Sequence, residues 1–169
     1  MTTVSNRDST HTTPLASALL RFKYRRHSQT GRRLASLLAV QAYSARLTCD
    51  VVIAVPLAPE RLAWRGFNQA AWLARAVATN IGRPLATDIL WRCRDTPAQA
   101  LLPRRQRLKN LDLAFQVRSG SNPPGRVLLV DDVFTTGATL KAAARALYKN
   151  GASRVDALVL LRALARPKL

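Results

Sequence analysis

The stretch Val127-Leu-Leu-Val-Asp-Asp-Val-Phe-Thr-Thr-Gly-Ala-Thr139 decides the fold. It opens with a short, continuous apolar run, which is typical of a strand buried on both faces of a parallel sheet. A polar loop follows, and then Thr139–Asn150 carries apolar residues at helical spacing, with Gly151 as a stop signal. Val155–Leu161 is again a continuous apolar run. Strand, loop, helix and strand in this order predict a βαβ unit.

The same signals recur before this unit. Asp50–Val55 is predicted as a third buried strand, closed by Pro56, and Asn68–Ile81 and Leu15–Arg46 show helical periodicity. We therefore predict an α/β fold: a doubly wound, mainly parallel sheet flanked by helices. Residues 87–117 differ, because two short strands, Ile89–Trp91 and Leu111–Val117, enclose a long basic stretch, and we expect them to form an added edge region. The expected division is a disordered polar leader over residues 1–14 and one domain over 15–169.

The chain of 169 residues carries 27 Lys and Arg against 9 Asp and Glu, a net charge of +18. This excess favours anionic partners, either nucleic acid or phosphorylated small molecules. Cys49 and Cys93 lie too far apart in the sequence for a CxxC metal or redox motif. No apolar run is long enough to span a bilayer and the amino-terminal residues lack a signal peptide's apolar core, so we expect a cytoplasmic protein without membrane insertion.

Asp131 and Asp132 stand at the end of the strand in the opening stretch, where parallel sheets bind ligands. Adjacent carboxylates can accept hydrogen bonds from vicinal ribose hydroxyls and can hold Mg²⁺ directly or through water. Thr135–Thr139 opens a helix with small hydroxylated residues and a glycine, which suits a phosphate group. The alternative is that Thr139 caps the helix and the two acids are simply solvated.

These residues resemble the phosphoribosyl-pyrophosphate motif of type I phosphoribosyltransferases. Pro56–Arg61, Arg65–Gln69 and Phe22–Arg25 narrow the resemblance to the ComF family of competence-associated proteins, as does a spaced set of residues between Arg94 and Asn110. Longer members of that family begin with a cysteine-rich, zinc-ribbon-like segment. This sequence has no cysteine before Cys49, so we expect no zinc.

The resemblance implies a set of site residues. Asp131 and Asp132 would contact the ribose hydroxyls and Mg²⁺, and the loop Thr135, Thr136, Gly137, Ala138 and Thr139 would bind the 5′-phosphate. Pro56, Leu57 and Arg65 match the pyrophosphate loop, and Arg104 and Arg107 lie in the basic stretch 92–110, which corresponds to a mobile loop that closes over the substrate. The sequence leaves Arg65 equally open to a structural role, and Phe67 and Asn68 to a hydrophobic staple and an N-cap.

The resemblance implies a phosphoribosyltransferase that binds Mg²⁺–phosphoribosyl pyrophosphate and transfers phosphoribose to an unidentified acceptor, with a link to competence and DNA uptake. The alternative is a non-catalytic module that binds phosphoribosyl pyrophosphate or a nucleotide and contacts single-stranded DNA or DNA-uptake proteins, for which exposed tryptophans would supply stacking surfaces. Either could act as a homo-oligomer. If the arginines of 21–33 and 92–107 converge on the Asp131 pocket, the enzyme is favoured. If they form one continuous surface that leads away, nucleic acid is favoured.

Overall fold

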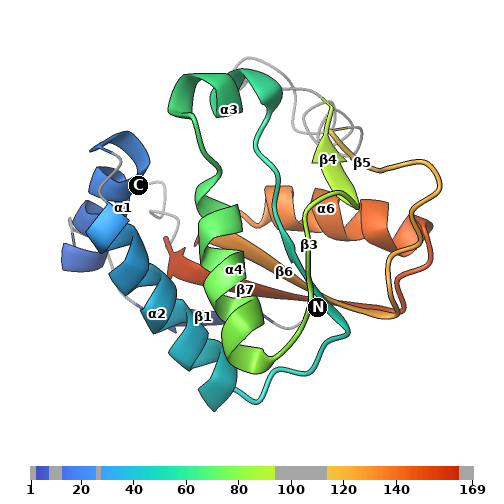
Figure 1. Ribbon diagram of the computed structural model, residues 1–169, viewed down its shortest axis with the longest axis horizontal. Coiled ribbons are helices and arrows are strands. Elements are labelled where there is room, and N and C mark those ends of the chain that lie inside the picture. The colour runs from blue at the N-terminus through green and yellow to red at the C-terminus, as the bar shows by residue number, and fades with distance from the viewer. Residues whose placement is uncertain (1–2, 8–12, 26–27, 94–113, 164–169) are drawn as a thin grey trace, which may run out of the picture.

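The computed structural model describes residues 3–7, 13–25, 28–93 and 114–163, and their centre is a parallel sheet with helices on both sides (Figure 1). The five strands lie in the order β1-β7-β6-β2-β3, and a separate antiparallel pair joins β4 and β5. The strands are β1 (Thr3–Arg7), β2 (Val51–Ala54), β3 (Leu85–Ala86), β4 (Leu90–Arg92), β5 (Phe115–Val117), β6 (Arg126–Phe134) and β7 (Arg154–Arg162). The helices are α1 (Pro14–Arg25), α2 (Ser28–Ser44), α3 (Pro59–Arg65), α4 (Gln69–Ile81) and α6 (Ala138–Lys149).

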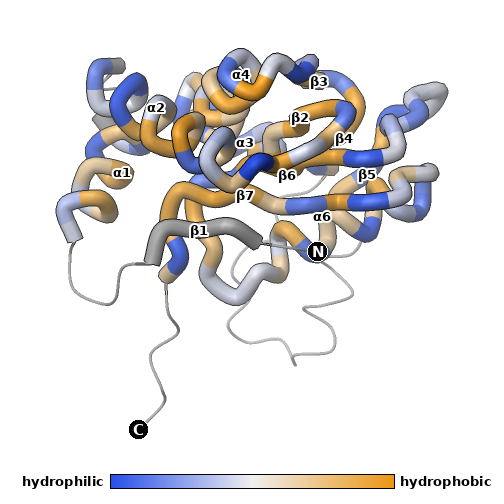
Figure 2. Tube along the Cα trace, turned by 90° about the horizontal axis from the view of Figure 1, so that it is seen from below, coloured by the Kyte–Doolittle hydropathy of each residue, from blue (hydrophilic) through white to orange (hydrophobic). Residues whose placement is uncertain are grey.

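Successive side chains of each strand point to opposite faces of the sheet, and each face carries its own buried core. Val127 and Leu129 of β6 pack on the side covered by α6, together with β4 and β5. Leu128 and Val130 pack on the opposite side, against α1, α2 and α4. Both sets are almost wholly buried, which explains why the central strands read as continuous hydrophobic runs in Figure 2. The predicted α/β architecture is confirmed.

The central elements fall where the sequence predicts them, with shifts at their ends. Asn68 is the N-cap of α4, because its side-chain oxygen accepts a 3.0 Å hydrogen bond from the Ala70 amide. β6 extends past the apolar run to Phe134, because it stays paired with β7 at Asp131 and beyond. The two acids therefore belong to the end of the strand itself, which fixes their backbone.

Three local expectations were wrong. Thr3–Arg7, predicted as part of a disordered leader, form β1 and pair in parallel with β7 at the sheet edge. Edge pairing uses backbone groups, so it leaves little signal in a polar sequence. The single helical segment over 15–46 is divided into α1 and α2, and α3 forms in what reads as a plain connection.

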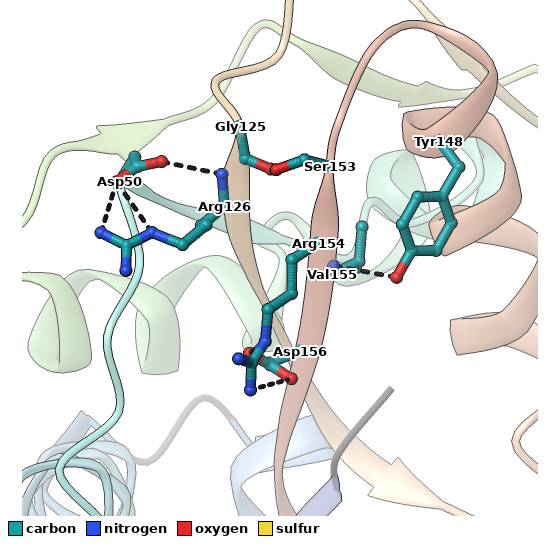
Figure 3. A network of polar contacts seen from close by, with 8 residues as sticks. All are labelled: Asp50, Gly125, Arg126, Tyr148, Ser153, Arg154, Val155 and Asp156. Carbon is teal, nitrogen blue, oxygen red and sulfur yellow. Dashed lines mark hydrogen bonds and ion pairs between the residues drawn. The ribbon is translucent and has the colours of Figure 1, made fainter.

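At the amino ends of the strands, Asp50 links β2 to β6 (Figure 3). Its carboxylate accepts hydrogen bonds from the Arg126 amide at 2.8 Å and from the Arg126 guanidinium Nη2 at 3.1 Å. Beside it, the Ser153 hydroxyl donates to the Gly125 carbonyl at 2.7 Å and joins the turns that precede β6 and β7. These contacts hold β2, β6 and β7 in register at the amino ends of the strands, opposite the end where Asp131 and Asp132 lie.

We expect Asp50→Asn to lower the urea midpoint at neutral pH. The hydrogen bonds from Arg126 hold the pKa of Asp50 below its ordinary value of 3.8, so this carboxylate stabilises the fold above that pH and the contribution fades as the pH falls further. The difference between the two proteins should therefore shrink in acid. Urea titrations of both proteins across this range measure it, with Asp88→Asn at an exposed position as the control. A difference that does not change with pH would contradict this account.

Candidate functional site

A cavity of about 170 Å³ lies at the carboxyl ends of β2 and β6. From β2 the sheet continues to β3 on one side, and from β6 it continues to β7 on the other, so the two strands flank the point where the strand order reverses. Open α/β sheets bind their ligands at such a point. Pro56 and Leu57, which follow β2, and Asp131 and Asp132 of β6 line the cavity together.

The two acids differ in their surroundings. Asp131 accepts a hydrogen bond from the Asp132 amide at 2.8 Å, and its pKa is raised to about 7, chiefly by burial and then by the charge of Asp132. Asp132 instead forms an ion pair with Lys23 of α1, with 2.7 Å between Nζ and Oδ2, and both side chains are mostly buried. The site thus holds one charged, paired carboxylate beside one that takes up a proton near neutral pH.

Four cationic side chains reach this cavity from three elements. Lys23 comes from α1, Arg61 and Arg65 from α3, and Arg92 from β4. Arg92 is 8% exposed and its guanidinium lies 5.3 Å from the centre of the Phe115 ring. Among the described residues, these four basic side chains therefore line the same cavity as Asp131.

The loop after β6 leads into α6 through a glycine. Gly137 is the N-cap with φ of +74°, so the alternative that Thr139 is the cap is wrong. The Thr136 hydroxyl accepts a hydrogen bond from the Ala138 amide at 3.4 Å. Thr139 lines the cavity, and Thr135 and Thr136 are exposed beside it. The first turn of α6 thereby presents its amides at the carboxyl end of β6, where the two acids lie. This geometry suits a phosphate group.

Comparisons with known proteins agree with this geometry. Residues 69–169 match the model of the phosphoribosyl transferase domain. The DNA utilization protein YhgH of Salmonella typhi is 34% identical over 161 residues, covering 92% of this chain and 70% of the relative. The competence protein F of Haemophilus influenzae is 34% identical over 157 residues, covering 89% and 69%. The chain belongs to the ComF family of phosphoribosyltransferase-domain proteins.

Solved structures place this ComF-family chain in the type I phosphoribosyltransferase fold. An allosteric regulatory enzyme of purine biosynthesis superposes with a TM-score of 0.53 at 20% identity, over 77% of this chain and 26% of that one. An adenine phosphoribosyltransferase superposes with a TM-score of 0.50 at 14% identity, over 81% and 72%. At this level of identity the likeness concerns the fold alone. None of the helices within the described residues is both long and apolar enough to cross a membrane.

The structure brings together most of the residues that the sequence singles out. Asp131, Asp132, Pro56, Leu57, Arg65 and Thr139 line the one cavity, and Thr135, Thr136, Gly137 and Ala138 form the adjoining loop. Arg104 and Arg107, and most of the basic stretch 92–110, lie outside the described residues.

Sequence reasoning assigned no role to Lys23, Arg61 or Arg92, which all reach the cavity. The first two lie in segments that carry the ComF resemblance, so that resemblance was the available signal. Asn68 is an N-cap that also donates to the Val55 carbonyl at 3.0 Å, which ties α4 to the end of β2.

The two acids offer oxygen ligands of the kind that Mg²⁺ prefers. Within the described ranges, no group of three or more His, Cys, Asp or Glu side chains is placed to hold a metal ion. Mg²⁺ commonly binds through one or two carboxylates and the oxygens of a phosphorylated substrate. Asp131 and Asp132 can supply the protein's share of such a site.

Gly137→Ala should destabilise the protein more than an ordinary glycine substitution. A Cβ at this position would lie 2.7 Å from Cε2 of Phe134, and the positive φ adds strain. We expect a loss of about 1–3 kcal/mol from the steric overlap, on top of about 1–2 kcal/mol from the backbone. Gly82→Ala is the matched control, since its φ is +63° but nothing lies within 4 Å of the added Cβ. Equal urea midpoints for the two variants would show that the Phe134 contact is unimportant.

Proposed function

We propose that this cavity binds Mg²⁺–phosphoribosyl pyrophosphate and that the protein transfers phosphoribose to an acceptor. The observation that carries this proposal is the meeting of two acids and four cations at the strand-order reversal of a phosphoribosyltransferase fold. Acids alone would suit a metal site and cations alone would suit any anion. Their combination matches a ligand with sugar hydroxyls at one end and phosphates at the other.

Each side chain has a role in this proposal. Asp131 and Asp132 accept hydrogen bonds from the ribose hydroxyls and hold Mg²⁺, and residues 135–139 bind the 5′-phosphate. Arg65, beside Pro56 and Leu57, binds the pyrophosphate, with Arg61 and Arg92 adding positive charge. Arg104 and Arg107 are proposed to close over the departing group, as the resemblance implies.

The proposed reaction is a substitution at the anomeric carbon of the ribose. A nucleophilic atom of the acceptor forms a bond to that carbon, and the bond to the pyrophosphate oxygen breaks, with its electron pair leaving on pyrophosphate. Mg²⁺ would neutralise charge on the phosphate oxygens. The arginines stabilise the negative charge that develops on the leaving group, and the carboxylates fix the sugar for attack.

Calorimetric titration with Mg²⁺–phosphoribosyl pyrophosphate tests binding, and pyrophosphate release across a panel of nucleobases tests transfer. We expect saturable binding that is lost when Asp131→Asn and Asp132→Asn are combined. An unmodified protein that binds no phosphoribosyl pyrophosphate would overturn the proposal. Binding without release for any acceptor would favour the non-catalytic module. Because the ComF relatives are named as DNA utilization and competence proteins, we propose that such an activity serves competence or DNA utilization.

A second surface favours contact with nucleic acid as the alternative function. A groove of about 690 Å³ is lined mainly by residues of α2 and α4, and its lining includes Trp72 and the cations Arg32 and Arg75. Trp72 is 39% exposed, and its ring makes a T-shaped contact with Phe22, with 6.0 Å between the ring centres. Aromatic and cationic groups side by side suit unpaired bases and their phosphates.

If the groove binds single-stranded DNA, Trp72→Ala should weaken binding of a labelled oligonucleotide by about 1–3 kcal/mol. Affinity of the unmodified protein should fall steeply with salt, since cations contact phosphates. Fluorescence anisotropy measures both effects, and Trp91→Ala, an exposed tryptophan on β4, is the control. Equal binding by the three proteins would exclude the groove.

A further inference from the structure

Two buried donors in the Asp131 cavity have no protein partner. Among the buried side-chain nitrogen and oxygen atoms of the described residues, Arg65 Nε and Gln69 Nε2 are those without a hydrogen bond. Gln69 is only 1% exposed, and both residues line the cavity. An unsatisfied buried donor costs about 1–3 kcal/mol, so folded proteins seldom keep one without a functional reason.

Arg65 fixes the orientation of the Gln69 amide. Its guanidinium Nη1 donates a 3.0 Å hydrogen bond to Gln69 Oε1, so the oxygen end of the amide faces α3 and the NH₂ end remains free. The guanidinium is held in turn against the ring of Tyr24, 5.6 Å from its centre. Gln69 begins α4, directly after the Asn68 cap. The two free donors are thus held by rigid neighbours before any ligand binds.

The surroundings of these donors identify the ligand group that they suit. Ala70, in the first turn of α4, and Thr139, in the first turn of α6, both line the cavity, so two helix N-termini face it. Lys23, Arg61 and Arg92 add positive charge. Each of these groups is positive or a hydrogen-bond donor. The acceptors are Asp131 and Asp132 on β6, and Asp132 already pairs with Lys23 at 2.7 Å. The donor side is therefore complementary to a multiply charged oxyanion.

We infer that Gln69 Nε2 and Arg65 Nε donate hydrogen bonds to the pyrophosphate oxygens of the sugar phosphate, which makes Gln69 a ligand-binding and specificity-determining residue. This rests on the proposed function. It extends the pyrophosphate site from the loop after β2 to the first residue of α4. It also gives the Arg65–Gln69 hydrogen bond a purpose, because that bond leaves the Gln69 amide nitrogen unpaired and available to a ligand.

Gln69→Met tests the inference, because methionine keeps the length of the side chain and removes the donor. Calorimetry with Mg²⁺ present would use two probes, inorganic pyrophosphate and ribose 5-phosphate. We expect pyrophosphate affinity to fall about ten-fold or more, while ribose 5-phosphate affinity stays unchanged. The unfolding temperature should not fall appreciably, since an unsatisfied donor is removed together with the bond to Arg65. Gln116→Met, at an exposed position of β5, is the matched control.

Gln69→Glu provides a second variant if the methionine protein folds poorly. It keeps an acceptor for Arg65 but replaces the donor with an oxygen that repels the anion, so pyrophosphate affinity should fall at least as far. Unchanged pyrophosphate binding in a folded variant would overturn the role of Gln69 and leave the proposed function standing. An equal loss for both probes would also overturn it, as a general disturbance of the site. If the unmodified protein binds neither pyrophosphate nor phosphoribosyl pyrophosphate, the proposed function itself is wrong.

Discussion

Asp131→Asn should raise the stability of the protein at about pH 8 while it abolishes binding of phosphoribosyl pyrophosphate. Burial, and then the neighbouring charge of Asp132, raise the pKa of Asp131 from its ordinary value of 3.8 to about 7. Above that pH the folded protein must hold a poorly solvated charge. Asparagine removes the charge and keeps the side-chain oxygen that accepts from the Asp132 amide at 2.8 Å.

The stabilisation by Asp131→Asn should depend on pH. A carboxyl whose folded pKa is raised costs nothing below about pH 4, because it is protonated in both states, and its cost grows as the pH rises to about 7. The full shift of the Asp131 pKa corresponds to about 4 kcal/mol in the free energy of unfolding. Because Asp131 is partly accessible through the cavity, we expect Asp131→Asn to raise that free energy by about 1–2 kcal/mol. Urea titrations of the two proteins at about pH 5 and pH 8 measure it.

The control for this experiment lies at the other end of the sheet. Asp50 has a pKa shifted in the opposite direction, so Asp50→Asn should destabilise the protein at the pH where Asp131→Asn stabilises it. The pair separates a local effect of the cavity from a general effect of removing an acid. A less stable Asp131→Asn at pH 8 would show that its carboxylate is well solvated or paired, and would weaken the case for a strained binding site.

The βαβ unit from Val127 to Leu161 could be predicted because each of its signals is local. Strands buried on both faces carry continuous apolar runs, and Gly151 lies just past the end of α6, with φ of +102°. Asp131 and Asp132 could be singled out for the same reason, since a residue at the end of a predicted strand has a predictable place in a parallel sheet.

Apart from Arg65, the cations around Asp131 could not be predicted in this way. Lys23 and Arg92 reach the cavity only because α1 and β4 pack on opposite faces of the sheet, and no local pattern reports such a meeting. The division of residues 15–46 into two helices was missed, although the apolar spacing breaks between Phe22 and Leu34, where the sequence is polar and basic. Both helices bury their apolar residues in the same core.

Lys23→Met should destabilise the protein and make it respond to Mg²⁺. The Lys23–Asp132 ion pair is 2.7 Å long, with side-chain exposures of 17% and 14%. Removal of one partner leaves Asp132 and Asp131 side by side without their nearest cation. For a partly accessible pair we expect a loss of about 2 kcal/mol at neutral pH, less than for a fully buried one.

Mg²⁺ and Lys23 compete for the same carboxylate in this account. Without a phosphate ligand, the ammonium group neutralises Asp132 and a free metal ion gains little by binding. Once Lys23 is replaced by methionine, two adjacent carboxylates at a cavity offer oxygen ligands with no competing cation. About 10 mM Mg²⁺ should then raise the unfolding temperature of the variant by several degrees and leave the unmodified protein nearly unchanged.

Differential scanning fluorimetry with and without Mg²⁺ measures this response, and Lys141→Met is the control because Lys141 lies exposed on α6. Equal responses from all three proteins would mean that Lys23 does not limit access of the metal ion to Asp132. A response confined to Lys23→Met would mean that α1 supplies a built-in counter-ion. Metal binding in the unmodified protein would then depend on a phosphorylated ligand that brings Mg²⁺ with it and displaces the lysine from the acid.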